Sequence, residues 1–175
     1  MSNVLLEEVR YKVTETPRGT WKRYVYPTGA SYAEYISKST LLGLPLVHYT
    51  RGLCPETGTH RVARGFFAVG RLAVGVIALG RAAAGVVALG QASLGVLALG
   101  QVCAGLGAVG QVAVGVALGI GQLATGYVCV AQLGLGKWVL AQLGLGRHVW
   151  STHVRDPAAV ELFKTLASGK LPPRF

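Results

Sequence analysis

Glycine returns at every fifth position through the middle of the chain, from Gly70 to Gly115. A small residue stands three places after each glycine, and in most units it is alanine, as at Ala73 and Ala78. The residue directly after the glycine alternates between polar and apolar, so the complete pattern repeats every ten residues. A one-residue insertion near Leu118–Ile120 shifts the phase, after which the pattern resumes. About eight repeats result, and such regularity is typical of a repeat architecture.

An α-helix cannot produce this pattern. Five residues turn a helix through about 500°, so successive glycines would lie about 140° apart and form no common face. A chain that closes into turns of fixed length, each paired with the next at about 4.8 Å, places like residues on like. The sequence therefore predicts an all-β fold, a single-stranded β-solenoid with a ten-residue period over residues 65–150. A flat coil of ten residues and a four-sided coil of twenty both fit this period.

Polarity suggests which residues of each turn face inward. An arginine without a partner cannot face a dry interior, so we expect Arg71 and Ala73 to point outward. The inward residues would then be Leu72, Val74, Ile77 and Leu79. Two alternatives would account for the constant small residue: it points inward against the facing strand, or it forms a flat surface that packs against another molecule. We expect the glycines to supply the backbone dihedrals of the corners.

Two sets of outward positions are candidates for function, and we call each set of equivalent repeat positions a column. The apolar column is a candidate assembly face: Val76, Val86, Val96, Leu106 and Val116. The polar column starts with two arginines and continues with glutamines: Arg71, Arg81, Gln91, Gln101, Gln111, Gln122, Gln132 and Gln142. Stacked amides that bond to one another along the solenoid are one interpretation of the polar column. A recognition stripe is the other.

Residues 1–64 differ from the repeats, because they are charged, aromatic and irregular. The alternation over Glu8–Thr14 predicts a strand, with Thr20–Tyr26 as its hairpin partner. The open end of a solenoid is an unpaired sheet edge, and proteins cover such edges. We therefore expect an N-terminal, β-rich cap.

Residues 151–175 contain the signals of a short helix. Asp156 is suited to the N-cap, Pro157 to the first helical position and Gly169 to the end. Residues 170–175 form a basic tail. We expect the helix to cover the last turn of the solenoid, while docking of helix and tail to a membrane or a partner is the alternative.

Several segments carry a resemblance to a known family. They are Ser37–His48, which contains Gly-Leu-Pro-Leu-Val-His, then Pro55–Gly58, then Val62–Gly70 at the start of the repeats, and finally Asp156–Phe163. Together they resemble an uncharacterised bacterial family of glycine-rich repeat proteins, over Tyr35 to about Phe163. The resemblance implies a solenoid fold and no agreed activity, so it supplies no catalytic residues. Relatives tend to carry Gly-Gly pairs where this chain has Gly-Arg and Gly-Gln, which sets the polar column apart.

The charge and cysteine content of the chain indicate which partners and which cellular compartment to expect. The formal net charge is +10, yet the stretch from Ala82 to Leu135 carries no charged residue. Basic ends favour anionic partners, among them an anionic membrane surface. The three cysteines, Cys54, Cys103 and Cys129, show no framework spacing, and the positions of Cys103 and Cys129 in the repeats indicate small buried residues in a reducing compartment. Residues 1–10 show no signal-peptide pattern, so the expected location is cytoplasmic, with membrane association as the second possibility.

The sequence offers no clear chemistry. His48, Cys54 and His60 lie six residues apart, which is not a metal-ligand spacing. No acid occurs between Glu56 and Asp156 to form a carboxylate pair. We expect no enzymatic activity, cofactor, metal or small-molecule substrate, and no nucleic acid, since arginines and aromatics do not interleave in the repeats.

The predicted function is structural. We expect a homo-oligomer or filament that self-associates or scaffolds partners through its apolar faces. The alternative is a peripheral or integral membrane protein, with the apolar surface in or against lipid and the basic ends at the headgroups.

Overall fold

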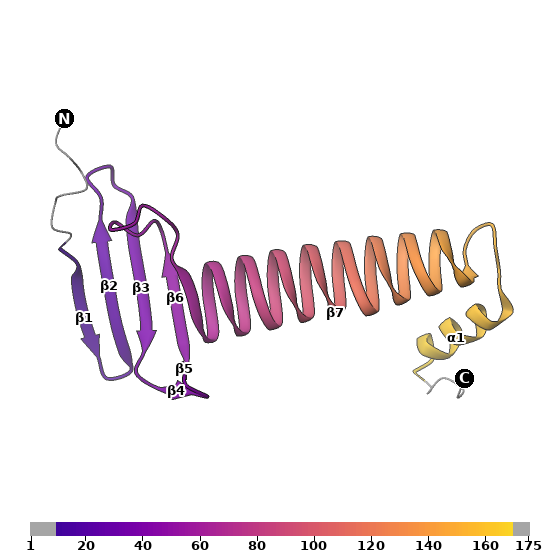
Figure 1. Ribbon diagram of the computed structural model, residues 1–175, viewed down its shortest axis with the longest axis horizontal. Coiled ribbons are helices and arrows are strands. Elements are labelled where there is room, and N and C mark those ends of the chain that lie inside the picture. The colour runs from indigo at the N-terminus through magenta and orange to yellow at the C-terminus, as the bar shows by residue number, and fades with distance from the viewer. Residues whose placement is uncertain (1–9, 170–175) are drawn as a thin grey trace. The chain divides into compact units, whose positions relative to one another are not determined.

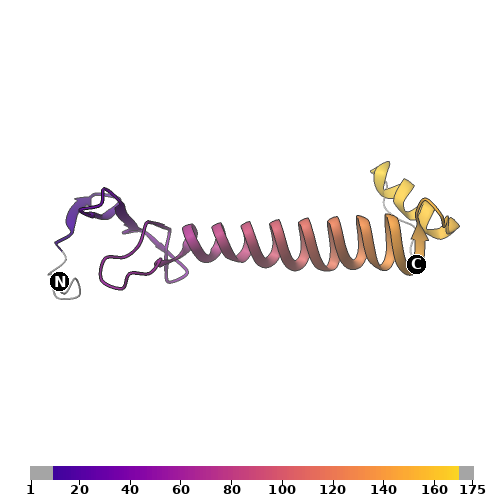
Figure 2. The same cartoon turned by 90° about the horizontal axis from the view of Figure 1, so that it is seen from above.

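The computed structural model describes residues 10–169, which form a β-rich chain followed by a C-terminal helix (Figures 1 and 2). Its elements are β1 (Lys12–Thr16), β2 (Gly19–Val25), β3 (Ser31–Ser37), β4 (Thr40–Leu41), β5 (Leu44–Pro45), β6 (Val47–Arg51), β7 (Val62–Trp150) and α1 (Pro157–Ala167). The chain divides into two compact units, Met1–Gly90 and Gln91–Phe175. The division falls inside β7. The boundaries expected at residues 64 and 150 stay predictions.

The first unit contains a five-stranded sheet with the order β1-β2-β3-β6-β7. Strands β1 and β2 pair as an antiparallel hairpin, with Thr14 opposite Trp21. The predicted hairpin is therefore present, although Glu8 and Val9 lie outside the described residues. Strand β6 pairs with the start of β7 in parallel, with Val47 opposite Phe67. The first hydrogen-bonding edge of β7 is thus paired with β6 of the preceding sheet. An open edge at the start of the repeats is avoided in this way.

Strand β7 winds in successive turns within each unit (Figure 1). At its glycines the backbone passes very close to an earlier part of the chain. A Cβ added at Gly75 or Gly85 would overlap the carbonyl oxygen of the glycine ten residues before it, and Gly105 behaves in the same way in the second unit. Any side chain here would force the two backbones apart.

The reason for these glycines differs from the one expected. Among the described residues, the glycines with positive φ are Gly29, Gly43, Gly52, Gly58 and Gly169, and all of them lie outside β7. The expectation that the repeat glycines supply special corner dihedrals is therefore wrong. They are needed because two backbones meet where no Cβ fits.

The predicted insertion is visible in the same contacts. Gly110 closely approaches the carbonyl of Gly100, ten residues earlier, whereas Gly121 approaches the carbonyl of Gly110, eleven residues earlier. Gly136 returns to a separation of ten, since it approaches Gly126. One turn thus absorbs one extra residue, and the spacing then recovers.

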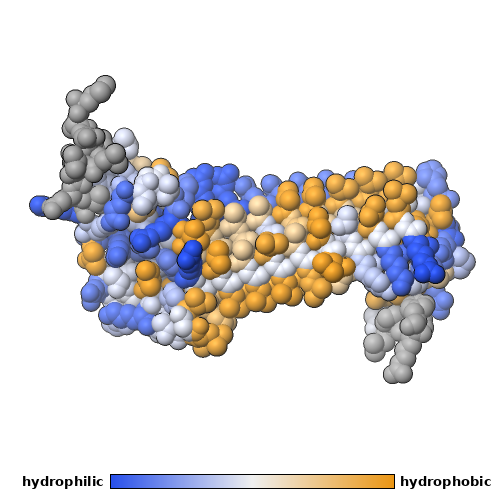
Figure 3. Space-filling model, viewed as in Figure 1, coloured by the Kyte–Doolittle hydropathy of each residue, from blue (hydrophilic) through white to orange (hydrophobic). Residues whose placement is uncertain are grey.

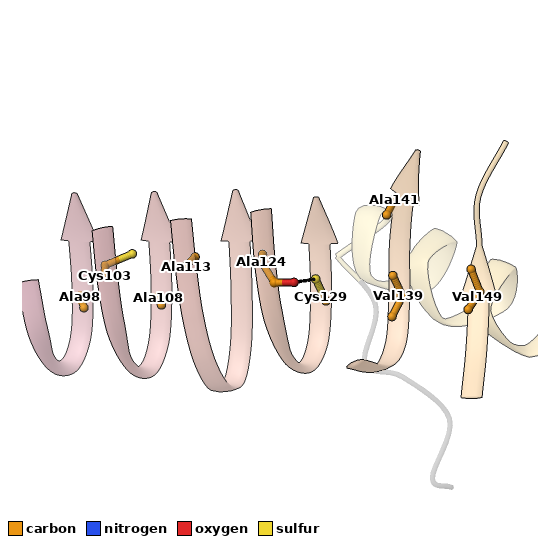
Figure 4. Packing of buried hydrophobic residues seen from close by; sticks show 9 residues of the cluster. All are labelled: Ala98, Cys103, Ala108, Ala113, Ala124, Cys129, Val139, Ala141 and Val149. Atoms are coloured by element: carbon orange, nitrogen blue, oxygen red, sulfur yellow. Dashed lines mark hydrogen bonds between the residues drawn. The ribbon is translucent and has the colours of Figure 1, made fainter. Parts of the chain in front are cut away.

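The interior of β7 is lined by the small residues of the repeat. In the first unit these are Ala63, Ala68, Ala73, Ala78, Ala83 and Ala88. In the second unit, Figure 4 shows Ala98, Cys103, Ala108 and Ala113 on consecutive passes of the strand. Ser93 occupies an equivalent position, and its buried hydroxyl has no hydrogen-bond partner among the described residues.

The predicted orientation of the turns is therefore wrong. Ala73 is only 1% exposed, whereas Leu72 is 37% and Val74 47% exposed, and Leu79 also faces outward. Arg71 lies on the side expected of it, and Ile77, expected inward, is half-buried. The interior is too tightly filled for larger side chains: a Cβ added at Gly110 or Gly134 would already come within 3.0 Å of the buried Cys103 or Cys129 sulfur, so leucine and valine point away from it.

The last turns show how tightly this interior is filled. Val139 is fully buried where earlier turns have alanine. Its neighbours at the inward positions are Gly134 and Gly144, and a Cβ added at either would come within 2.9 Å of Val139 Cγ1. A larger residue on one pass is thus matched by glycine on the adjacent passes.

Helix α1 follows the predicted signals. The Asp156 carboxylate accepts a hydrogen bond of 2.9 Å from the Ala158 amide, and Pro157 occupies the first turn. Leu162 and Phe163 are buried against Trp138 near the end of β7. The short C-terminal capping helix is confirmed, while the basic tail at residues 170–175 lies outside the described residues.

Candidate functional site

The most distinctive surface of the molecule is the outer side of β7, because its exposed side chains are apolar. In the first unit, Leu72, Val74, Leu79 and Val86 are exposed. In the second unit the exposed set is larger and includes Leu94, Val96, Leu97, Leu99, Val102, Leu106, Val109, Val114 and Val116. In Figure 3, apolar residues lie along the visible side of β7 on both sides of a pale band. A contiguous apolar surface of this kind marks a contact with another molecule or with lipid.

The predicted assembly face belongs to this surface. Val86, Val96, Leu106 and Val116 are exposed, and Val76 is half-buried. The face is not an isolated stripe, however, because Leu97 and Leu99 expose further apolar area beside it. Sequence reasoning missed these neighbours because it assigns the equivalent leucines to the interior.

The polar column is the exception to the apolar exterior. Arg71, Arg81, Gln91, Gln101, Gln111, Gln122, Gln132 and Gln142 are all exposed. Among the described residues, the side-chain amides of the last five make no hydrogen bond, so the expected amide ladder is absent there. The N–H donors and carbonyl acceptors of these side-chain amides are therefore available to bond with groups outside the chain.

Charged and aromatic side chains flank the uncharged stretch. In the first unit, Arg61, Arg64 and Arg71 lie near the start of β7 and are exposed. In the second unit, Lys137 Nζ donates a 2.7 Å hydrogen bond to the Tyr127 hydroxyl. Each unit thus carries basic groups next to apolar surface.

Aromatic rings lie beside these basic groups in the second unit. Trp138 stacks on His148 with 4.2 Å between ring centroids. His148 Nδ1 donates to the Asp156 carboxylate over 2.8 Å, and this bond holds the pKa of that carboxyl below its usual value. Trp150 packs against the cluster formed by α1 and Trp138.

A buried polar network in the first unit was missed by the sequence analysis. Glu34 on β3 is 2% exposed and accepts hydrogen bonds from the Tyr32 hydroxyl at 3.0 Å and from Arg61 Nη1 at 3.1 Å. His48 Nε2 lies 3.1 Å from its other oxygen. Because the Arg64 amide donates to His48 Nδ1 over 2.9 Å, Nε2 carries the proton donated to Glu34. No local sequence signal joins these residues, since they come together only through β3, β6 and the start of β7.

The network controls the ionisation of its members. Burial alone would raise the pKa of the Glu34 carboxyl, but the hydrogen bonds from His48 and Tyr32 and the charge of Arg61 outweigh it and lower that pKa. Burial raises the pKa of Tyr32 to about 12. Glu34 is therefore a charged, fully bonded anchor of the sheet, and its carboxylate has no open side for a substrate.

Replacing Glu34 by glutamine is expected to lower the stability of the first unit by about 2 kcal/mol at neutral pH, because a buried anion is lost from its donors. The lowered pKa means that this stability is present above the ordinary carboxyl pKa and is lost as the pH falls through the folded value. Acid unfolding of the wild type should therefore approach that of Glu34→Gln at low pH. Near-ultraviolet circular dichroism measures this acid unfolding, because all tyrosines except Tyr127 belong to the first unit.

Glu15→Gln is the matched control. Glu15 forms an exposed ion pair of 3.8 Å with Lys38, so its loss should change stability by about 0.5 kcal/mol or less. An equal effect of both substitutions would contradict the assignment of Glu34 as the buried anchor.

The three residues considered as metal ligands have other partners. His48 belongs to the Glu34 network. His60 Nδ1 donates to the Gly52 carbonyl at 2.9 Å, and its Nε2 accepts from Arg71. The Cys54 thiol is buried 3.9 Å from the Tyr11 hydroxyl. Within residues 10–169 no group of three His, Cys, Asp or Glu side chains is arranged to hold a metal ion.

The described chain does not include a helix with the length and apolar character required to cross a membrane.

Comparison with known proteins gives no relative. No family model matches the chain, and searches of the curated proteins and of the solved structures return no match. The resemblance to the glycine-rich repeat family therefore stays a prediction.

Proposed function

We propose that this protein is a structural membrane protein without enzymatic activity, whose repeats form a β-solenoid embedded by its apolar outer surface in the hydrocarbon of a lipid bilayer. The observation that carries this proposal is the reversal of the usual arrangement: methyl-sized side chains line the interior of β7, while leucine and valine face outward. A soluble domain buries its large apolar residues, whereas a lipid-facing segment displays them.

The solenoid with ten residues per turn is supported by the glycine contacts. Gly75, Gly85 and Gly105 each approach the backbone ten residues earlier, which favours the flat ten-residue coil over a twenty-residue one. In such a coil the backbone groups of each turn pair with the neighbouring turns. Backbone pairing within the structure is the condition that hydrocarbon imposes, because it offers no partner for an N–H or C=O group.

Charge and dimensions agree with this location. The second unit carries no charge from Gln91 to Leu135. By strand spacing alone, those four to five turns would extend about 22 Å, against a hydrocarbon core about 30 Å thick. The uncharged stretch begins at Ala82 in the first unit. The exposed Tyr127 and Lys137 are residue types found at the boundary between lipid and water.

Self-association in water is the second candidate, and the apolar column Val76–Val116 is the feature that favours it. A contact through that column alone would leave Leu97 and Leu99 exposed to water. Lipid covers every apolar column at once, so the membrane accounts for more of the surface. The basic residues at the start of β7 would then lie near anionic headgroups.

Membrane fractionation tests the proposal. The wild type is expected to remain with membranes after an alkaline carbonate wash and to enter vesicles of phosphatidylcholine with a minor share of anionic lipid. Leu106→Arg places a charge in the uncharged stretch and should reduce this partitioning by about a hundredfold, since a central charge costs about 3 kcal/mol. Val13→Arg is the control, because Val13 is exposed on β1, outside the apolar surface.

Recovery of the wild type in the aqueous fraction, stable without detergent or lipid, would overturn the membrane proposal. Discrete soluble oligomers in that fraction would support self-association in water instead.

A further inference from the structure

Five of the six glutamines of the second unit are outward residues that do not suit a lipid-facing surface. We call Gln101, Gln111, Gln122, Gln132 and Gln142 the glutamine column. All five are exposed, and apolar side chains such as Leu123, Leu133 and Leu143 are exposed directly beside them. One amide thus occurs in each repeat, at the same position.

These amides have hydrogen-bonding capacity that the chain does not use. Each carries two N–H donors and a carbonyl acceptor. Among the described residues, none bonds to the five side-chain amides. In hydrocarbon an unpaired amide costs several kcal/mol, so partners from outside the chain are required.

We propose that two copies of this chain associate within the bilayer through their glutamine columns, an inference that rests on the membrane location proposed above. An amide is its own complement, because its N–H groups donate to the carbonyl of another amide. A second copy presents amides with the same repeat spacing, so that several pairs form in one register. Polar side chains hold membrane-embedded segments together in this way.

The residues next to the glutamines would permit the close approach that such pairs need. Three of the five glutamines follow a half-buried glycine, namely Gly100, Gly110 and Gly121, whereas Ala131 and Ala141 before the last two belong to the interior cluster. Small residues at an interface let two backbones come near enough for side-chain amides to meet. The apolar column contains no amide. In lipid, its side chains therefore have no unpaired polar group that a second copy of the chain would have to satisfy.

The combined variant Gln101→Leu, Gln111→Leu and Gln122→Leu tests the proposal in vesicles of phosphatidylcholine. Förster transfer between donor- and acceptor-labelled full-length chains, measured at increasing dilution in lipid, gives the association constant. We expect the variant to associate roughly tenfold or more weakly than the wild type, because three amide pairs are lost. The control replaces Val96, Leu106 and Val116 by alanine, and it should associate like the wild type.

The sign of the change separates polar from apolar association. Leucine is more apolar than glutamine, so contacts driven by apolar area would become stronger in the glutamine variant. An unchanged or stronger association of that variant would overturn the proposal, and so would a wild type that is monomeric at every dilution.

Two further measurements separate the possible causes of a changed signal. Sedimentation with vesicles is measured first, and a wild type that fails to bind them overturns the membrane function and this inference together. Normal vesicle binding with unaltered association of the glutamine variant overturns this inference alone. Protection of the buried Cys129 thiol from maleimide shows that each variant is folded.

Discussion

Replacing Gly105 by alanine is expected to prevent β7 from folding in the second unit. The new Cβ would overlap the carbonyl oxygen of Gly95, and the carbonyl carbon of that residue lies within 3.2 Å. Because the obstacle is backbone, it cannot rotate away, and one turn has to shift relative to the next. We expect a loss of about 3 kcal/mol or more, at the upper end of what overpacking costs. Maleimide labelling of the buried Cys103 and Cys129 thiols measures the unfolding.

Gly107→Ala is the matched control two residues away. Its Cβ would meet only the end of the Leu97 side chain, at 3.1 Å, and the nearest backbone atom lies 4.0 Å away. Leu97 is exposed and can adopt another rotamer, so the change should cost less than about 1 kcal/mol. Equal labelling of the two variants would mean that close backbone approach is not the reason for the repeat glycines.

This contrast explains why the repeat could be read from the sequence. Where a Cβ collides with backbone, glycine is the residue that fits, so such positions recur without exception and reveal their spacing. Gly121 shows the same property, because the glycine ladder moves by one residue at the insertion. The spacing alone did not reveal why glycine is needed: a Cβ would collide with a carbonyl oxygen ten residues earlier, whereas the sequence suggested special corner dihedrals.

The C-terminal helix was predictable for a different reason. The signals of Asp156, Pro157 and Gly169 act on their immediate neighbours, so each is visible in a short stretch of sequence. The Asp156 carboxylate bonds to an amide two residues later, and Gly169 adopts a φ of 69° just after the helix. Local chemistry of this kind needs no knowledge of the tertiary fold.

The orientation of the turns and the Glu34 network could not be predicted, because both depend on distances between separate passes of the chain. Large apolar residues are normally inside, and that rule placed Leu72 and Val74 on the wrong side. The strict smallness of Ala73 and its equivalents was the signal against it. Glu34 had no such signal, since His48 and Arg61 reach it from other segments of the fold.

The reversed turns also affect how the protein gains stability. An interior of alanine buries little apolar area, so the hydrophobic contribution from inside β7 is small. The leucines and valines that would supply the larger share contribute only when something covers them from outside. Folding of β7 and insertion into lipid would therefore support each other under the proposed function.

Replacing Ala98 by leucine is the second substitution expected to abolish the fold. Ala98 is 1% exposed and packs in the interior cluster with Cys103 and Ala108. A leucine would need room that the facing pass does not leave, at a cost of about 3 kcal/mol or more. The neighbouring Leu97→Ala is the control, because Leu97 is 53% exposed and its truncation leaves the interior unchanged. Thermal unfolding by far-ultraviolet circular dichroism and labelling of Cys129 should separate the two variants.

The chain itself indicates how such an overpacked interior can be rescued. Val139 is accommodated because Gly134 and Gly144 occupy the adjacent inward positions. Ala98→Val alone should therefore be destabilising, and the addition of Ser93→Gly and Cys103→Gly should restore much of the lost stability.

A folded Ala98→Leu protein with protected Cys129 and weakened association would place this position at an interface instead. Failure of the glycine rescue, together with a tolerated leucine, would show that the volume between the passes does not limit the choice of residue.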